Sequence, residues 1–237
     1  MRRTRARQGD DPEAVAHVAP NGFRWRVAYP ERTSAGIGAR RPLARVLVGE
    51  GDGDAIGVPI AVARRLESGE GSEPSSRAEL SHRISSLAGA CAWERVVAMA
   101  ARREYSSLEA AARLTRDGYL ERTAEEAVAK AVRLRIIDDR RFADSFVRSK
   151  LSVGWGTRKI ERELSSRGIE PADVPGWPDA YLDGEDLGER ALALLRPRRV
   201  PERNAFPKFV RFLVSRGYPT GVAMNAARAR IDEEASC

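Results

Sequence analysis

The chain of 237 residues has few of the side chains that build catalytic or metal centres. It contains two cysteines and two histidines, and none of them stands in a metal-ligand spacing such as HExxH or CxxC. A P-loop, a GxSxG motif and a complete dinucleotide fingerprint are also missing. The adjacent Asp138 and Asp139 point different ways at a helix start, so we interpret them as capping residues. We therefore predict a protein that is not an enzyme and that uses no metal and no cofactor.

Long apolar runs are absent as well, and none reaches the length that spans a bilayer. The basic first residues are followed by Gly9, Asp10 and Asp11 rather than by the apolar segment of a secretory signal. Two cysteines, Cys91 and Cys237, are too few for a disulfide framework. We expect a soluble, cytoplasmic, monomeric protein with no membrane contact.

Positive charge is abundant, although lysine is scarce. The formal net charge is +7, and lysine occurs four times among 41 basic residues. Residues 140–167 hold eight basic and three acidic side chains, and residues 196–216 hold seven and one. The acidic stretch 170–189 separates them with seven carboxylates and no lysine or arginine. Two local basic regions of this kind favour an acidic partner, either a nucleic acid or an acidic protein surface.

The most informative stretch is 136–169, which predicts two helices joined by a glycine-rich turn. Asp138 is a good N-cap, and Asp139 follows where the helix dipole favours negative charge. Helical spacing relates the apolar side chains of the first helix, which are Phe142, Phe146, Val147 and Leu151. Gly154 and Gly156 are expected to break this helix around Trp155, with Thr157 capping the second helix.

The second of these helices is expected to end in a Schellman cap. That motif needs a left-handed residue at Gly168 and an apolar contact between Leu164 and Ile169. The same spacing recurs at Leu114, Gly118 and Tyr119, and again at Leu213, Gly217 and Tyr218. The three glycines are 50 and 49 residues apart, a period that indicates tandem repeats of about 50 residues. We expect each repeat to contain three helices.

The remaining segments give a coarse map of the chain. Alternation at 23–29 is compatible with a short strand or with a sticky tail. Two β-branched runs at 45–48 and 56–60 flank Gly51–Asp54 and predict a hairpin. A helix is expected at 60–66, a linker at 68–76, and helix again from about Glu79. Capping boxes are predicted at Ser106 with Glu109 and at Thr123 with Glu126, and a cap at Asn204.

These observations define the predicted architecture. It is mainly α, with three tandem three-helix repeats in an elongated, curved array after a small N-terminal β element and a flexible tail. The predicted segments are a basic tail at 1–41, a β-hairpin and linker at 42–78, and a helical repeat domain at 79–237. Within that domain the repeats are placed at about 88–135, 136–183 and 184–237.

The central stretch resembles the bacterial RecX family of regulatory proteins. The run from Ile137 to Ala143 is similar to the family's IDD..FA signature, and the Gly154, Gly156 and Gly168 pattern follows at the family's spacing. The matching signature positions are Asp138, Asp139, Phe142, Gly154, Gly156, Leu164 and Gly168. The resemblance covers about residues 90–231. It departs at Arg135, where the family often has glycine, in the proline-containing loop 171–178, and in the long N-terminal segment that precedes the helical repeats.

The resemblance implies tandem three-helix repeats that bind the filament of the RecA recombinase on DNA and modulate it, usually by inhibition. DNA recombination, DNA repair and the SOS response are the implied processes. Basic side chains off the apolar stripes are the expected contacts with RecA or DNA. These are Arg141, Arg148, Lys150, Arg158, Lys159, Arg162, Arg198, Arg199, Arg203, Lys208 and Arg211. Three alternatives stay open, namely an ordinary solvated basic face, direct binding of DNA or RNA without a recombinase, and a scaffold for another protein.

Overall fold

The computed structural model describes residues 16–31, 41–49, 55–69, 73–182 and 184–235. Internal contacts divide the chain into two compact units. Unit 1 contains residues 1–102 and 110–136, and unit 2 contains residues 103–109 and 137–237. The expected flexible tail falls partly on residues 1–15 and 32–40, and the Gly51–Asp54 turn and Cys237 also lie outside the described residues.

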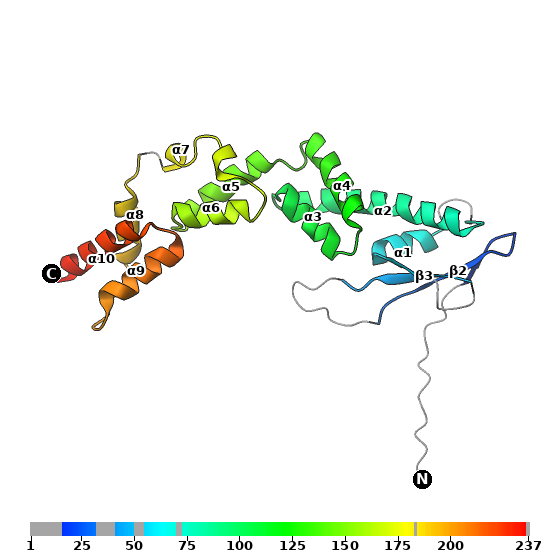
Figure 1. The fold of residues 1–237 in the computed structure, drawn as a ribbon, viewed down its shortest axis with the longest axis horizontal. Helices are drawn as coiled ribbons and strands as arrows, with labels where there is room; N and C mark the ends of the chain where they lie inside the picture. The colour runs from blue at the N-terminus through cyan, green and yellow to red at the C-terminus, as the bar shows by residue number, and fades with distance from the viewer. Residues whose placement is uncertain (1–15, 32–40, 50–54, 70–72, 183, 236–237) are drawn as a thin grey trace, which may run out of the picture. The chain divides into compact units, whose positions relative to one another are not determined.

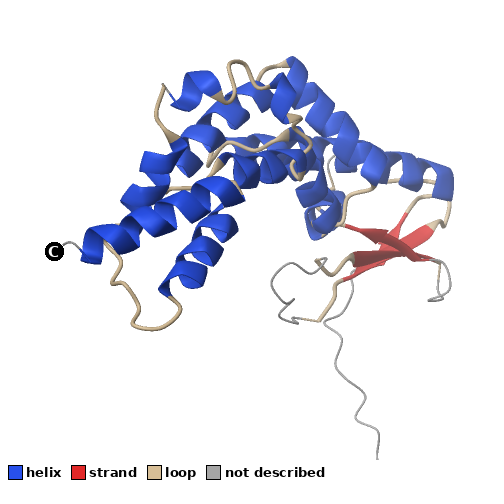
Figure 2. Ribbon diagram, turned by 60° about the vertical axis from the view of Figure 1, so that its left-hand side comes forward, coloured by secondary structure: helices blue, strands red, loops and turns tan. Residues whose placement is uncertain are grey.

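Unit 1 begins with an antiparallel sheet in the order β1-β2-β3-β4. The strands are β1 (Ala16–Val18), β2 (Arg24–Ala28), β3 (Ala44–Val48) and β4 (Ala55–Val58). Trp25 pairs with Val48 and Val27 pairs with Val46, so alternate residues of β2 are buried on one face. The helices of the unit lie on one side of this sheet (Figure 2). The predicted hairpin and the strand at 23–29 are confirmed, and they belong to one larger sheet with β1.

Helices complete unit 1. They are α1 (Ile60–Glu67), α2 (Arg77–Ala100) and α4 (Glu121–Arg133), together with α3 (Ser107–Arg116) from Ala110 onward, since the first three residues of α3 belong to unit 2 (Figure 1). α2 packs against both α1 and α4. It is one continuous helix that begins two residues before the predicted Glu79, because Ser76 Oγ accepts a hydrogen bond from the Glu79 N–H and caps its first turn.

Helices are the only regular elements among the described residues of unit 2. Its elements are α5 (Asp139–Ser152), α6 (Thr157–Ser165), the 3₁₀ turn η1 (Pro171–Asp173), α7 (Asp179–Leu182), α8 (Leu187–Leu195), α9 (Ala205–Arg216) and α10 (Thr220–Ala235). One buried cluster joins α5 and α6 to Val174 and Leu182, and a second joins α8, α9 and α10. Pro175 and Pro178 prevent a long third helix in the middle repeat, which has η1, with Pro171 at its first position, and α7 instead.

All three predicted Schellman caps are confirmed. Gly118, Gly168 and Gly217 have φ of +99°, +75° and +95°. The N–H of the following residue donates to the carbonyl of Leu114, Leu164 or Leu213 at 3.1 Å in each case. Because this is the same 6→1 bond at the same helix end three times, the structure contains the repeat that the sequence spacing predicts.

The same cap closes two further helices. At the end of α5, Trp155 N donates to Lys150 O at 3.0 Å and Gly154 has φ of +79°. At the end of α4, Ile136 N donates to Ala131 O at 2.9 Å, and the left-handed residue is Arg135 with φ of +55°. Arg135 therefore occupies a backbone position that glycine adopts at lower cost.

Two of the predicted N-caps are wrong. Gly156, rather than Thr157, is the N-cap of α6. Leu120 precedes α4, which leaves Thr123 inside that helix. In both cases the helix starts earlier than the side-chain oxygen suggested.

For two other predicted caps, one part of the prediction is confirmed: the position of Asn204 and the side-chain bond of Ser106. Asn204 is the N-cap residue of α9, but its side chain makes no capping hydrogen bond. Ser106 Oγ does accept a bond from Glu109 N at 3.1 Å. The Glu109 carboxylate, however, lies 3.2 Å from Arg103 and 3.2 Å from Arg167.

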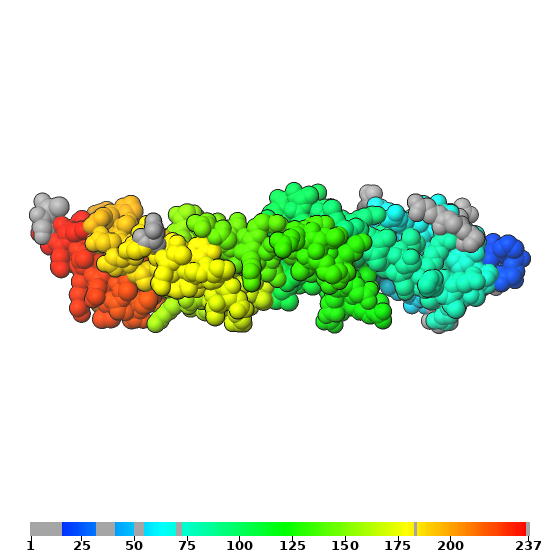
Figure 3. Space-filling view, turned by 90° about the horizontal axis from the view of Figure 1, so that it is seen from above, coloured from blue at the N-terminus to red at the C-terminus, as the bar shows by residue number. Residues whose placement is uncertain are grey.

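A hydrogen bond recurs between each helix end with a Schellman cap and an earlier segment of the chain, and we call this contact the joint. Ser106 Oγ, at the start of α3, donates to Arg167 O at 3.0 Å, and Gly156 N, at the start of α6, donates to Arg216 O at 2.8 Å. In unit 1, Arg41 N donates to Arg116 O at 2.9 Å, one residue earlier relative to the Schellman glycine Gly118. In Figure 3 the residues of the third repeat adjoin those of the second repeat. The joint positions the candidate site because it fixes α9 against α6.

Candidate partner-binding surface

The eleven predicted contact residues all lie in unit 2, and the structure divides them by their local partners. Arg141 and Arg148 form ion pairs with neighbouring carboxylates. Arg141 contacts Glu104 through Nε at 2.7 Å and through Nη2 at 3.2 Å, and Arg148 contacts Asp144 at 3.0 Å. These hydrogen bonds raise the pKa of both guanidinium groups and, from Arg148, lower the pKa of Asp144. Both arginines would have to leave these partners to bind a ligand.

Three more of the predicted residues lie over aromatic rings. Lys159 Nζ is 4.1 Å and Lys150 Nζ is 5.1 Å from the centre of the Trp155 ring. The guanidinium of Arg198 lies 3.7 Å from the centre of the Phe212 ring. Cation–π contacts of this kind anchor the charged group to the protein while leaving it exposed in part. These residues contribute positive charge at fixed places on the surface.

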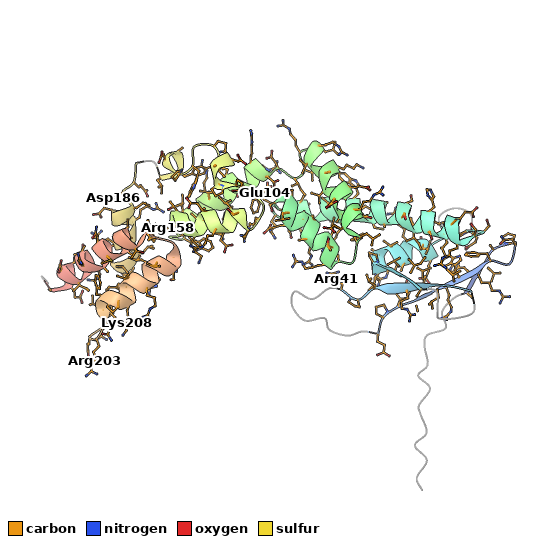
Figure 4. The ribbon with its side chains drawn as sticks, in the orientation of Figure 1. Arg41, Glu104, Arg158, Asp186, Arg203 and Lys208 are labelled. Atoms are coloured by element: carbon orange, nitrogen blue, oxygen red, sulfur yellow. The ribbon has the colours of Figure 1, made fainter. Side chains whose placement is uncertain are left out.

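The other six side chains have no hydrogen bond, ion pair or ring contact within the described part of the chain. We call them the unpaired basic set, and they are Arg158, Arg162, Arg199, Arg203, Lys208 and Arg211. All six are exposed. Arg158 and Arg162 share one face of α6, and Lys208 and Arg211 share one face of α9, since residues three and four apart are neighbours on a helix. Arg203, in the turn before α9, and Lys208 lie on the outside of the unit (Figure 4).

The joint between α6 and α9 brings the two helical pairs onto one folded unit. A Cβ atom built on Gly217 would lie 2.4 Å from Lys159 Cβ and 2.5 Å from Lys159 N. Arg158 is the residue next to this contact. Real Cβ atoms do not approach that closely, so the closeness of the two helices depends on glycine at this position.

Sequence reasoning missed the residues that hold the joint. Arg167 lies 3.2 Å from Glu109 and donates to the Glu163 carbonyl at 2.7 Å, and Arg216 donates to the Val153 carbonyl at 3.0 Å. Both arginines directly precede a Schellman glycine, at a spacing of 49 residues. That repeated Arg-Gly pair was a usable signal, but a single chain does not show whether such an arginine binds a partner or holds the fold.

The described residues contain no group of three or more His, Cys, Asp or Glu side chains that could hold a metal ion. Across the same residues, no helix has both the length and the apolar character needed to cross a membrane. Phe142 of α5 and Phe209 of α9 act as core residues. Phe142 and Phe209 are 5% and 4% exposed, so neither offers a free ring face to a ligand.

Comparison with known proteins identifies relatives over the helical part of the chain. A family model described as RecX, second three-helix domain, matches residues 138–174. The regulatory protein RecX from one strain of Thermus thermophilus is 35% identical over 134 residues, which span 56% of this chain and 87% of the relative. That of Chromohalobacter salexigens is 34% identical over 52% of this chain and 81% of the relative. That of Stenotrophomonas maltophilia is 28% identical over 59% and 87%.

Two solved structures are also similar. One, a crystal structure of regulatory protein RecX, has a TM-score of 0.49 and 21% identity, and the match covers 77% of this chain and 91% of that one. The other, RecX from Lactobacillus salivarius, has a TM-score of 0.49 and 19% identity, and the match covers 60% and 96%. Because relatives at 35% and 34% identity are matched over most of their length, the chain belongs to the RecX family of regulatory proteins.

Proposed function

We propose that this protein binds the filament of the RecA recombinase on DNA and restrains its activity, with the unpaired basic set of unit 2 as the main contact. Membership of the RecX family supports the choice of partner. The observation that carries the proposal is the group of six exposed cations with no partner inside the described chain. Such groups need no internal ion pair to be broken before they meet phosphates or carboxylates, which favours fast, salt-dependent association.

The proposed inhibition depends on exposed cations that lie on successive repeats. α6 and α9 belong to different repeats, so a ligand that contacts Arg158 and Lys208 contacts both. A filament displays the same acidic features at regular intervals, and a repeat protein matched to that interval binds several of them at once. A regulator bound across neighbouring subunits opposes the motions of ATP turnover and the addition of further subunits.

The test is the DNA-stimulated ATPase rate of the cognate RecA with this protein added below stoichiometry. We expect the rate to fall, and the low dose separates filament binding from simple competition for DNA. The double variant Lys208→Gln/Arg211→Gln should need about tenfold more protein for half-inhibition, the effect of losing roughly 1.4 kcal/mol of contact energy. Its matched control is Arg122→Gln/Arg133→Gln, which removes the same charge from α4 in unit 1.

Direct nucleic-acid binding is the second candidate, and the same basic side chains favour it. It would be supported by tight binding to naked DNA with a steep dependence on salt, together with an unchanged ATPase rate at every dose. A scaffold function would leave both assays insensitive to the Lys208 and Arg211 substitutions. Inhibition by the variant equal to that of the unmodified chain would contradict the assignment of this surface.

A further inference from the structure

Unit 1 contains a cluster of three arginines around a single carboxylate. Asp117, in the turn after α3, is 9% exposed. Its Oδ1 lies 3.1 Å from Arg41 Nε and 3.6 Å from Arg113 Nε, and its Oδ2 lies 2.8 Å from Arg95 Nε. Arg41 comes from the segment before β3, beside the end of α3 (Figure 4). One carboxylate balances one guanidinium, so this cluster holds two positive charges in excess.

A cavity of about 110 Å³ opens beside the cluster. Arg41, Arg95, Asp117 and Tyr119 form one part of its wall. The first turn of α1, with Ile60 and Ala61, forms another part. That turn follows Pro59, which provides no side-chain cap, and it contains no acidic residue. In that turn Val62 N and Ala63 N donate to Pro59 O at 2.9 and 3.0 Å, so α1 adds positive potential through the N-terminal end of its dipole, beside arginines that already make the cavity positive.

We propose that this cavity binds a phosphate group. Two guanidinium groups line it, and a guanidinium matches the oxygens of a phosphate with paired N–H donors. Tyr119 is a further residue of the wall. Asp117 also lines the cavity, but arginines engage both of its oxygens, which limits its repulsion of an anion. The cavity volume of about 110 Å³ is sufficient for a phosphate group. The site is in unit 1 and is independent of the basic set proposed to contact the filament.

Calorimetric titration of the full chain with inorganic phosphate tests the proposal, with ionic strength held constant by sodium chloride. We expect saturable binding that Arg41→Gln weakens by about tenfold, the cost of one charge-assisted hydrogen bond. Arg41 is the suitable position because its side chain is 60% exposed and Asp117 keeps Arg95 and Arg113. Arg122→Gln is the matched control. It removes one exposed arginine from the same unit, away from the cavity, and should bind phosphate as the unmodified chain does.

A second variant reverses the direction of the effect. Asp117→Asn removes the only carboxylate of the cluster, so phosphate should raise its melting temperature more than that of the unmodified chain. The proposal is overturned if phosphate binds no better than chloride, or if the chain and Arg41→Gln respond equally. The phosphate can come from DNA or from a small molecule. Competition by a short DNA duplex would assign the backbone, whereas binding of phosphate and ATP without such competition would assign a free phosphate compound.

Discussion

At the residue scale, the left-handed caps show which details a sequence reveals. Gly118, Gly168 and Gly217 were identified in advance because glycine is the usual residue at such a position, and the following apolar residue marks the motif. Arg135 occupies the same kind of position with φ of +55°, and no propensity rule would place an arginine there. A helix end was predictable where the local residue type agrees with the backbone, and it was not predictable at Arg135.

Replacing Arg135 by glycine should stabilise the protein. A non-glycine residue in the left-handed region raises the free energy of the folded state by about 1–2 kcal/mol, and glycine removes this strain. Glycine also gives the unfolded chain more conformational entropy, which offsets about half of the gain. We expect a gain of about 0.5–1 kcal/mol in urea unfolding. Arg133→Gly, inside the last turn of α4, is the control and should lower stability by a similar amount. Equal losses for both variants would refute the strain at position 135.

The buried Tyr119 predicts loss of stability in alkali. Burial raises its pKa to about 12, with smaller contributions from Cys91 and Asp117. The folded protein therefore resists ionisation that the unfolded chain accepts near pH 10. The contribution of Tyr119 to the free energy of unfolding is constant below pH 10 and falls as the pH rises from about 10 to about 12. Tyr119→Phe should show a smaller fall across that range, measured by urea unfolding at pH 9 and pH 11. An identical pH slope in the two proteins would contradict the assignment.

At the scale of elements, the helices and strands were largely predictable, while the contacts between them were not. Periodicity located α5, α6, α8 and α9, and β-branched runs located β3 and β4. The joint could not be predicted from the sequence, because two of its donors are backbone N–H groups and all of its acceptors are backbone carbonyls. Such groups occur at almost every residue and leave no pattern of side chains. The two failed caps, at Thr157 and Thr123, have the same origin, since helix starts are decided by packing as well as by the capping side chain.

Glycine at 217 should be essential to the joint. Gly217→Ala places a Cβ 2.4 Å from Lys159 Cβ and forces an unfavourable φ of +95°, so we expect a loss of more than about 2 kcal/mol. Gly221→Ala is the control on α10, where a Cβ meets nothing within 4 Å, and it should be neutral or stabilising. Thermal unfolding measures both. A small effect at Gly217 would show that α6 and α9 can separate without cost.

Ser106 holds the preceding joint and can be tested separately. It is fully buried, and its hydroxyl both accepts from Glu109 N and donates to Arg167 O. Ser106→Ala leaves an uncapped α3 and an unpaired carbonyl, for an expected loss of about 2 kcal/mol in urea unfolding. Ser215→Ala is a suitable control, since that hydroxyl is exposed and bonds only within α9. Equal stability of the Ser106 variant and the unmodified chain would mean that water replaces both bonds.

For the whole molecule, the number of unpaired basic side chains determines how strongly we expect it to bind the filament and how steeply that binding depends on salt. Removing residues 184–237 deletes four members of the unpaired basic set, while α5 and α6 retain a buried cluster of their own. We expect the truncated chain to bind RecA filaments more weakly and with a shallower dependence on salt, measured by co-sedimentation between about 50 and 200 mM NaCl. Undiminished binding would count against contacts by the third repeat. The predicted segment boundaries at 41, 78, 135 and 183 remain predictions.

The basic surface itself was predictable only in part from the sequence. Charge counting found the right region, because arginine and lysine off the apolar stripe must be exposed. It could not separate Arg158 from Arg141, although one is unpaired and the other bonds Glu104, which is 37 residues away in the chain. Pairing over such distances depends on tertiary structure, and only the folded chain reveals which cations are available.

The recurring joint also bears on how such a protein changes over evolutionary time. Two of its bonds end on main-chain carbonyls next to a glycine, so the side chain at each acceptor position can change without removing the acceptor. A duplicated or deleted repeat would bring a matching pair of ends with it. The number of repeats and the charge of their surfaces can therefore change during evolution while the way the repeats join stays the same.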